Sequence, residues 1–120
     1  MEPAGEERRS AQPPRMTVRF AREFRAMMAY CPDESRAACY RRLVAELRPV
    51  FSGPGDGGGR RAGWVYLLTD AGTAAFGAKQ VGPAAELLDE AWSRRHYLPA
   101  GTEETAKATA HLALAHAATV

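Results

Sequence analysis

The sequence has few cysteines, little net charge and no long apolar run. Its two cysteines, Cys31 and Cys39, are too few for a disulfide framework or for a zinc site with four thiolate ligands. No run approaches the roughly 18 apolar residues of a membrane-spanning helix, and residues 1–15 lack the apolar segment of a secretory signal. We therefore expect a soluble, cytoplasmic protein that does not contact a membrane.

The small net charge does not by itself imply a polyanionic partner. Sixteen basic and fourteen acidic residues give +2, although the charge is unevenly distributed. Residues 1–61 hold twelve basic and eight acidic residues, and residues 62–120 hold four and six. Apolar residues make up 46% of the chain, and many are alanine, which favours helices but contributes little free energy on burial. A chain of this length is expected to form one domain around one core.

Helical periodicity begins after a polar N-terminus. Residues 1–15 have no apolar periodicity and are predicted to be a disordered tail, followed by a single helical domain over residues 16–120. Two amphipathic helices come first, one starting at a Thr17 cap and the other over residues 34–51, with Pro32 in the turn between them. Their expected apolar faces are Phe20, Phe24, Met27, Met28 and Cys31 in the first helix, and Tyr40, Leu43, Val44, Leu47 and Phe51 in the second.

A glycine-rich loop and two alanine-rich helices are predicted farther along the chain. Six of the twelve residues in 52–63 are glycine, so this stretch is expected to be a flexible loop. The G-x-G-x-x-G pattern inside it lacks the preceding strand and following helix of a dinucleotide-binding site. One later helix begins near Pro83, and a final helix covers about 103–118 after a Thr102 cap. Their pairing is similar in packing style to the helices of tetratricopeptide arrays.

Residues 60–79, RRAGWVYLLTDAGTAAFGAK, have two interpretations. Read as a helix, they place Val65, Leu68, Thr69 and Gly72 on one buried face, and the whole chain becomes an all-α bundle of about five helices. Read as a strand that leads into a helix, they resemble winged-helix transcription regulators, whose wing strand often ends in Tyr-x-Leu-Thr-x-x-Gly. Tyr66, Leu68, Thr69 and Gly72 match that pattern, which implies an α+β winged-helix fold. We prefer the all-α interpretation, because no partner strand for a wing can be identified.

The winged-helix alternative implies a DNA-binding surface. Its recognition helix would be residues 34–51, and its wing tip would lie at residues 60–61. The basic bias of residues 1–61 fits this alternative. The residues implied to contact DNA are Ser35, Arg36, Arg41, Arg42, Arg60 and Arg61.

No pattern in the sequence predicts catalysis, a metal site or a cofactor. His111 and His116 are five residues apart, so on a helix they diverge by about 140° and lack the spacing of a zinc-binding pair. The adjacent carboxylates at 89–90 and 103–104 diverge by about 100° and do not form an acid–base pair. Cys31 and Cys39 are expected to be small buried thiols. We therefore expect that the protein is not an enzyme.

The preferred function is a protein–protein interaction module, such as an adaptor or a regulatory subunit. Its amphipathic helices contain few large apolar residues, so part of the apolar surface is expected to be covered by another protein or by a second copy of the chain. The two tryptophans are expected in the core, but either one, if exposed beside arginines, would suit a binding hot spot. The candidate partner-binding residues are Trp64, Trp92, Arg94 and Arg95.

Overall fold

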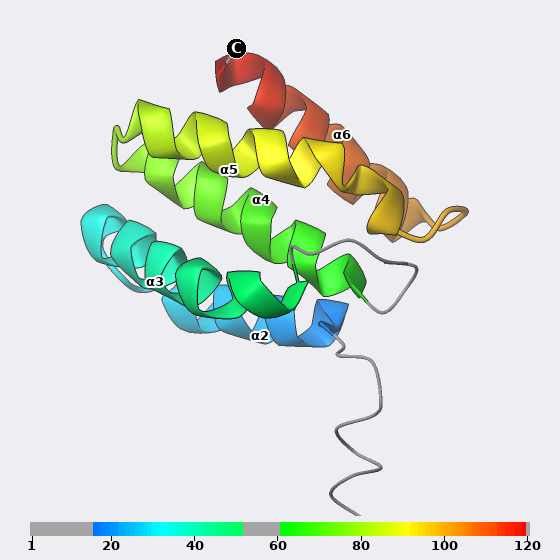
Figure 1. The fold of residues 1–120 in the computed structure, drawn as a ribbon, viewed down its shortest axis with the longest axis horizontal. Coiled ribbons are helices and arrows are strands. Elements are labelled where there is room, and N and C mark those ends of the chain that lie inside the picture. The colour runs from blue at the N-terminus through cyan, green and yellow to red at the C-terminus, as the bar shows by residue number, and fades with distance from the viewer. Residues whose placement is uncertain (1–15, 52–60, 120) are drawn as a thin grey trace, which may run out of the picture.

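The structure, a computed structural model, describes residues 16–51 and 61–119, and its regular elements are all helices (Figure 1). The elements are α2 (Val18–Met28), α3 (Asp33–Phe51), α4 (Ala62–Gly77), α5 (Val81–Ser93), the short 3-10 helix η2 (Arg95–Tyr97) and α6 (Glu103–Thr119). No strand occurs in these two ranges. The predicted all-α bundle of about five helices is confirmed. The predicted tail over 1–15 and loop residues 52–60 lie outside the described residues.

Side-chain caps and one left-handed residue set the helix boundaries. The hydroxyl of Thr17 accepts a hydrogen bond from the Phe20 amide at 3.1 Å, and that of Thr102 accepts one from the Thr105 amide at 3.0 Å. Both predicted N-caps are therefore confirmed. After α4, Lys79 takes a left-handed conformation with φ 65°, which turns the chain sharply into α5.

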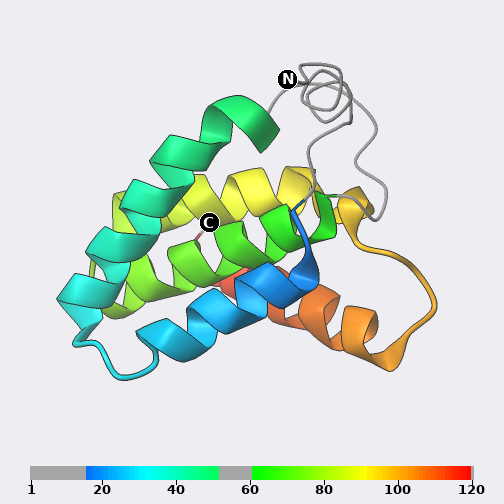
Figure 2. The same ribbon diagram turned by 90° about the horizontal axis from the view of Figure 1, so that it is seen from below.

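The helices form antiparallel hairpins that stack side by side. α4 pairs with α5, and α6 lies against α5, whereas α2 and α3 each pack on α4 and make little contact with each other (Figure 1). Figure 2 shows α2 and α6 on one side of α4, and α3 and α5 on the other. α2, α4 and α6 run in one direction, while α3 and α5 run in the opposite direction. α4 contacts each of the other four α-helices and is the centre of the stack.

The central position of α4 explains why its sequence has two interpretations. Eleven of its sixteen residues are buried, and Trp64, Leu67 and Leu68 are fully buried. A helix that is covered over most of its surface is largely apolar and loses the contrast that reveals a period of 3.6. Residues 66–72, which resemble a wing strand, lie inside this helix, so the winged-helix interpretation of the fold is wrong.

A close backbone approach fixes the start of α4. The Gly63 amide donates a hydrogen bond to the Met16 carbonyl at 2.9 Å, and a Cβ atom on Gly63 would lie 2.1 Å from the Thr17 carbonyl oxygen. No residue with a side chain fits there without displacing the backbone. Residues 62 and 63 therefore belong to α4, and the prediction that the loop extends to residue 63 is wrong.

The apolar face of α3 is predicted well, and that of α2 only in part. Tyr40, Val44 and Phe51 of α3 are buried as predicted. In α2, however, Met27 is 66% exposed and Ala21 is the buried residue. The reason is that α2 packs on α4 through the small side chain of Ala21. The face of α2 that contacts α4 therefore lies beside the face that its large apolar residues form.

Candidate functional site

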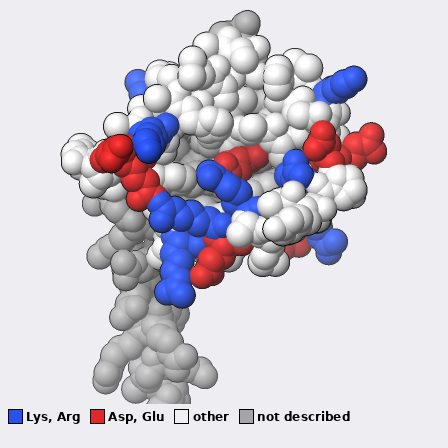
Figure 3. Space-filling view, turned by 180° about the vertical axis from the view of Figure 1, so that it is seen from behind, with Lys and Arg blue, Asp and Glu red and all other residues white. Residues whose placement is uncertain are grey.

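A hollow with a volume of about 690 Å³ lies on the face that α2, α4 and α6 share. Residues of α3 and Leu98 complete its lining, and none of its lining residues comes from α5. We call it the α2–α4–α6 groove. Figure 3 shows basic and acidic side chains gathered around a hollow on this face. Its polar lining residues are Arg22 and Arg25 from α2, Arg36 and Tyr40 from α3, Tyr66, Thr69, Asp70 and Thr73 from α4, and Glu104, Lys107 and His111 from α6.

An ion pair between α2 and α4 lies in this groove. The Arg25 guanidinium donates two hydrogen bonds to the Asp70 carboxylate, Nη2 to Oδ1 at 3.0 Å and Nε to Oδ2 at 3.1 Å. Asp70 is the only charged residue of α4, and its side chain is 11% exposed. Burial raises the pKa of Asp70 above its ordinary value, although Arg25 and, more weakly, His111 lower it. The Asp70 carboxylate is therefore poorly solvated, and it interacts with Arg25 more strongly than a carboxylate on an open surface would.

Tyr40 brings a buried hydroxyl to the same groove. Its side chain is 2% exposed, and its ring packs edge-to-face on Phe24 with ring centroids 4.9 Å apart. Like an ordinary tyrosine, Tyr40 is protonated at neutral pH and can donate a hydrogen bond, and burial raises the pKa of its hydroxyl further.

Charged residues span the groove between α2 and α6. Arg22 of α2 forms an ion pair with Glu104 of α6. A second hollow, of about 470 Å³, lies next to the first and shares Arg22, Tyr66 and Glu104 with it. Lys107 lies about one turn beyond Glu104 along α6 and also lines the groove. The two hollows therefore adjoin each other at the Arg22–Glu104 pair.

Most residues that the winged-helix alternative assigned to DNA have other local partners. Arg36 donates hydrogen bonds to the Met28 carbonyl at 2.9 Å and the Cys31 carbonyl at 2.6 Å, which holds the turn between α2 and α3. Arg41 donates to Gln80 at 3.2 Å beyond the end of α4. The other positions are Arg42, paired with Glu46, the exposed Ser35, Arg61, which donates to the Phe51 carbonyl, and Arg60, which lies outside the described residues.

These arginines do not gather on one surface. Arg61 precedes the first residue of α4, whereas the partner of Arg41 follows its last turn. The two side chains therefore lie at opposite ends of the central helix. The arrangement that would bring a recognition helix and a wing tip to one DNA duplex is absent from the described residues.

The predicted protein-binding residues separate into core and surface. Trp64 is 0% exposed and packs on Phe51, so the exposure that a hot spot requires is not met at this position. Trp92 is half-buried on α5, outside the groove. The Arg95 guanidinium lies over the Trp92 ring, 4.2 Å from its centroid, and the ring of His116 stacks on Trp92 at 5.4 Å. Trp92 and Arg95 thus form a surface cluster of their own.

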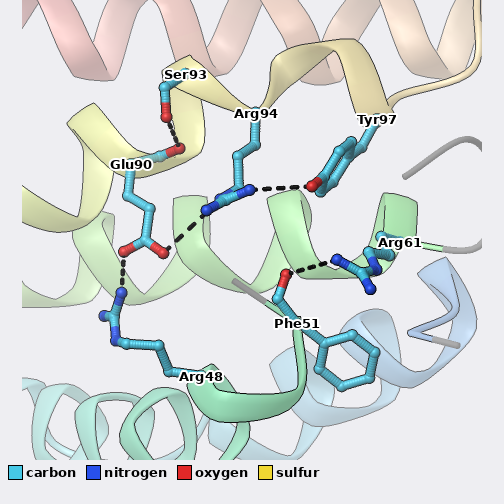
Figure 4. A network of polar contacts seen from close by, with 7 residues as sticks. All are labelled: Arg48, Phe51, Arg61, Glu90, Ser93, Arg94 and Tyr97. Carbon is cyan, nitrogen blue, oxygen red and sulfur yellow. Dashed lines mark hydrogen bonds and ion pairs between the residues drawn. The ribbon is translucent and has the colours of Figure 1, made fainter. Parts of the chain in front are cut away.

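Arg94 belongs to a polar network that links the two hairpins (Figure 4). It donates a hydrogen bond to the Tyr97 hydroxyl at 3.0 Å and lies 4.0 Å from the Glu90 carboxylate. Glu90 also forms an ion pair with Arg48 of α3. The network joins α3, α5 and η2, so Arg94 acts in the packing of the helices.

The sequence prediction missed the pair at the centre of the groove. Arg25 and Asp70 are 45 positions apart, and nothing local in the sequence indicates that they meet. One signal was available, because Asp70 is the single charge in an otherwise uncharged stretch of sixteen residues. The expectation that both thiols are buried is also wrong, since Cys39 is exposed, and both cysteines are free.

Neither a cluster of three potential metal ligands nor a membrane-spanning helix occurs in the described residues. No cluster of three His, Cys, Asp or Glu side chains in 16–51 and 61–119 is placed to hold a metal ion. In the same two ranges, no helix has both the length and the apolar character needed to cross a bilayer. The chain matches no family model, no curated protein and no solved structure.

Proposed function

We propose that the protein is a non-enzymatic interaction module, an adaptor or regulatory subunit, whose α2–α4–α6 groove receives a segment of a partner protein. The observation that carries this proposal is the pair of adjoining hollows along α2, α4 and α6. Stacked helical hairpins form extended surfaces of this kind, and a chain segment fits them better than a compact metabolite does.

The structure of the floor supports the same proposal. The floor is provided by α4, which is held by four neighbouring helices and is therefore the most constrained element of the described chain. A groove on a rigid floor loses little conformational entropy when a segment binds, and this favours binding. Apolar wall residues such as Val65 and Leu98 alternate with polar ones, a combination typical of recognition sites.

In this proposal, no side chain of the groove acts in catalysis. The carboxylate of Asp70 is occupied by Arg25 on both oxygens, and the hydroxyls of Thr69 and Thr73 donate to carbonyl groups of their own helix. We place the interaction in the cytoplasm, where free thiols such as those of Cys31 and Cys39 stay reduced.

Site-specific photo-crosslinking tests the proposal. A photoreactive residue at Lys107, which lines the groove, is expected to crosslink a partner in cells, whereas one at Lys79, outside the lining, is not. Thr73→Trp places a large ring in the groove and is expected to reduce the Lys107 crosslink at least about tenfold, because it removes the space that a segment needs.

Ser93→Trp is the matched control for the groove-blocking variant. Ser93 is an exposed hydroxyl residue on α5 that, like Thr73, donates to a carbonyl of its own helix. Its replacement is expected to leave the crosslink unchanged. Equal crosslinking from Lys79 and Lys107, or a crosslink that survives Thr73→Trp, would contradict the proposal. Light scattering identifies a partner that is a second copy of the chain.

A further inference from the structure

The groove contains the entire excess positive charge of the described residues. Residues 16–51 and 61–119 hold twelve basic and ten acidic side chains. Four of these basic and two of these acidic side chains line the α2–α4–α6 groove. Eight of each sign are left elsewhere, so the rest of the described chain is balanced. The charge asymmetry of the molecule is therefore a local property of this groove.

The hydrogen-bond acceptors of the groove are already occupied. Both oxygens of Asp70 accept from Arg25, and Glu104 is paired with Arg22. A ligand that offered mainly donors would have to compete with two arginines for these carboxylates. Such a ligand would lose part of its binding energy in breaking existing pairs.

Several donors of the groove, by contrast, are available. Lys107 has one ion pair, with Glu103 at 3.7 Å, and both side chains are more than three-quarters exposed, so this pair is weak. The hydroxyls of Tyr40 and Tyr66 line the groove and have no hydrogen-bond partner within the described residues. His111 stands one turn beyond Lys107 on the same helix and lines the groove too. The groove therefore has an excess of donors over acceptors.

We infer that the partner segment is acidic, and that its carboxylates bind to Lys107 and to the hydroxyls of Tyr40 and Tyr66. This inference rests on the proposed function, since it names the chemistry of the segment that the groove receives. Carboxylate oxygens accept hydrogen bonds without donating any, which complements an excess of donors.

A peptide fits the groove better than a nucleic acid does. A polyanionic strand is bound by several cations that neutralise successive phosphates, yet two of the four cations here are already paired with acidic residues of the same groove. The walls also include apolar residues such as Val65, Ala74 and Leu98, which suit the side chains of a peptide.

Selection from a random peptide library tests the inference. Peptides are selected on the wild-type protein and depleted on Thr73→Trp, so that the remaining peptides depend on the groove. We expect these peptides to be enriched in aspartate and glutamate. Lys107→Glu is expected to weaken their binding at least about tenfold, because it replaces an attractive contact with a repulsive one. Lys79→Glu, the same change at the other lysine, is expected to alter binding less than about twofold.

The outcomes separate this inference from the proposed function. Groove-dependent peptides without an acidic excess, or an equal response of the two lysine variants, would overturn the inference and leave the interaction module intact. A selection that returned no groove-dependent peptide would overturn both. A labelled single-stranded oligonucleotide that displaced the selected peptides at lower concentration than an acidic peptide would identify nucleic acid as the ligand and would also overturn the inference.

Discussion

α4 and α6 are nearly equal in length, with sixteen and seventeen residues, but they differ greatly in burial. Eleven residues of α4 are buried, whereas α6 buries only Thr105 and Leu112. The two helices run in the same direction and line the same groove (Figure 2). The difference therefore comes from their places in the stack, because α4 is covered by helices on both sides and α6 lies at its edge.

This comparison assigns different tasks to the two helices. α4 provides the fixed floor of the groove, and its residues hold the fold together. α6 carries Lys107 and His111 on an element with little core of its own. Elements with few buried apolar contacts open at low free energy, so we expect α6 to be the adaptable wall of the groove.

The largest expected effect is that of Leu68→Ala in α4. Leu68 is fully buried at the centre of the stack, and truncating such a side chain leaves a cavity that the surrounding helices cannot fill. We expect the free energy of unfolding to fall by about 3–5 kcal/mol. Urea denaturation followed by far-ultraviolet circular dichroism measures this loss. A smaller loss of unfolding free energy than that caused by Leu112→Ala in α6 would contradict the comparison between the two helices.

Leu112→Ala in α6 is expected to have a smaller and more local effect. Leu112 is the one large buried residue of α6, and its truncation should destabilise the protein by roughly 2–3 kcal/mol. Hydrogen exchange should show that the amides of α6 lose protection while those of α4 keep theirs. Leu114→Ala is the control, because Leu114 is 74% exposed and its loss is expected to change stability by less than about 0.5 kcal/mol.

Arg25→Ala is expected to have the smallest effect, and one that depends on pH. Burial raises the pKa of Asp70, so its contribution favours folding in acid and is lost as the pH rises through that raised value. Without Arg25, the main group that lowers this pKa is gone, and the value rises further. The variant should match the wild type closely in acid and be less stable by about 1–3 kcal/mol at neutral pH, as urea denaturation across the pH range will measure.

Two further variants isolate the ion pair in that experiment. Adding Asp70→Asn to Arg25→Ala removes the unpaired carboxylate, so the double variant should recover most of the lost stability and should not show the pH dependence of Arg25→Ala. Arg19→Ala breaks the exposed pair with Glu23 on the same helix and should have almost no effect. An Arg25→Ala deficit that persists in acid would mean that the ion pair is not its cause.

The helices outside α4 could be predicted from sequence because their signals are local. Thr17 and Thr102 are hydroxyl residues directly before helices, and the stripe from Tyr40 to Phe51 follows a period of 3.6 in a half-buried helix. α4 lacked such a signal, since its burial depends on neighbours that are distant in sequence. The resemblance to a wing strand arose from that uniform apolar character.

The groove could not be predicted because it is assembled from four helices. Arg22 and Arg25 look like ordinary exposed residues of the first helix, and Glu104 looks like a charge that favours a helix N-terminus. Their common site follows only from the stacking of α2 and α6 on the same side of α4. The tryptophans, which the sequence made prominent, lie outside this groove, and Trp64 belongs to the core.

The shared direction of α2, α4 and α6 has a consequence for anything that lies along them. Each helix carries a partial positive charge of about one half at its first turn and an equal negative charge at its last. The first turns of these three helices lie at the same end of the stack, so their dipoles add along the face that carries the groove. If the groove binds a partner segment as proposed, a segment with charge at one of its ends is expected to prefer one orientation, and its reversed sequence is expected to bind less tightly.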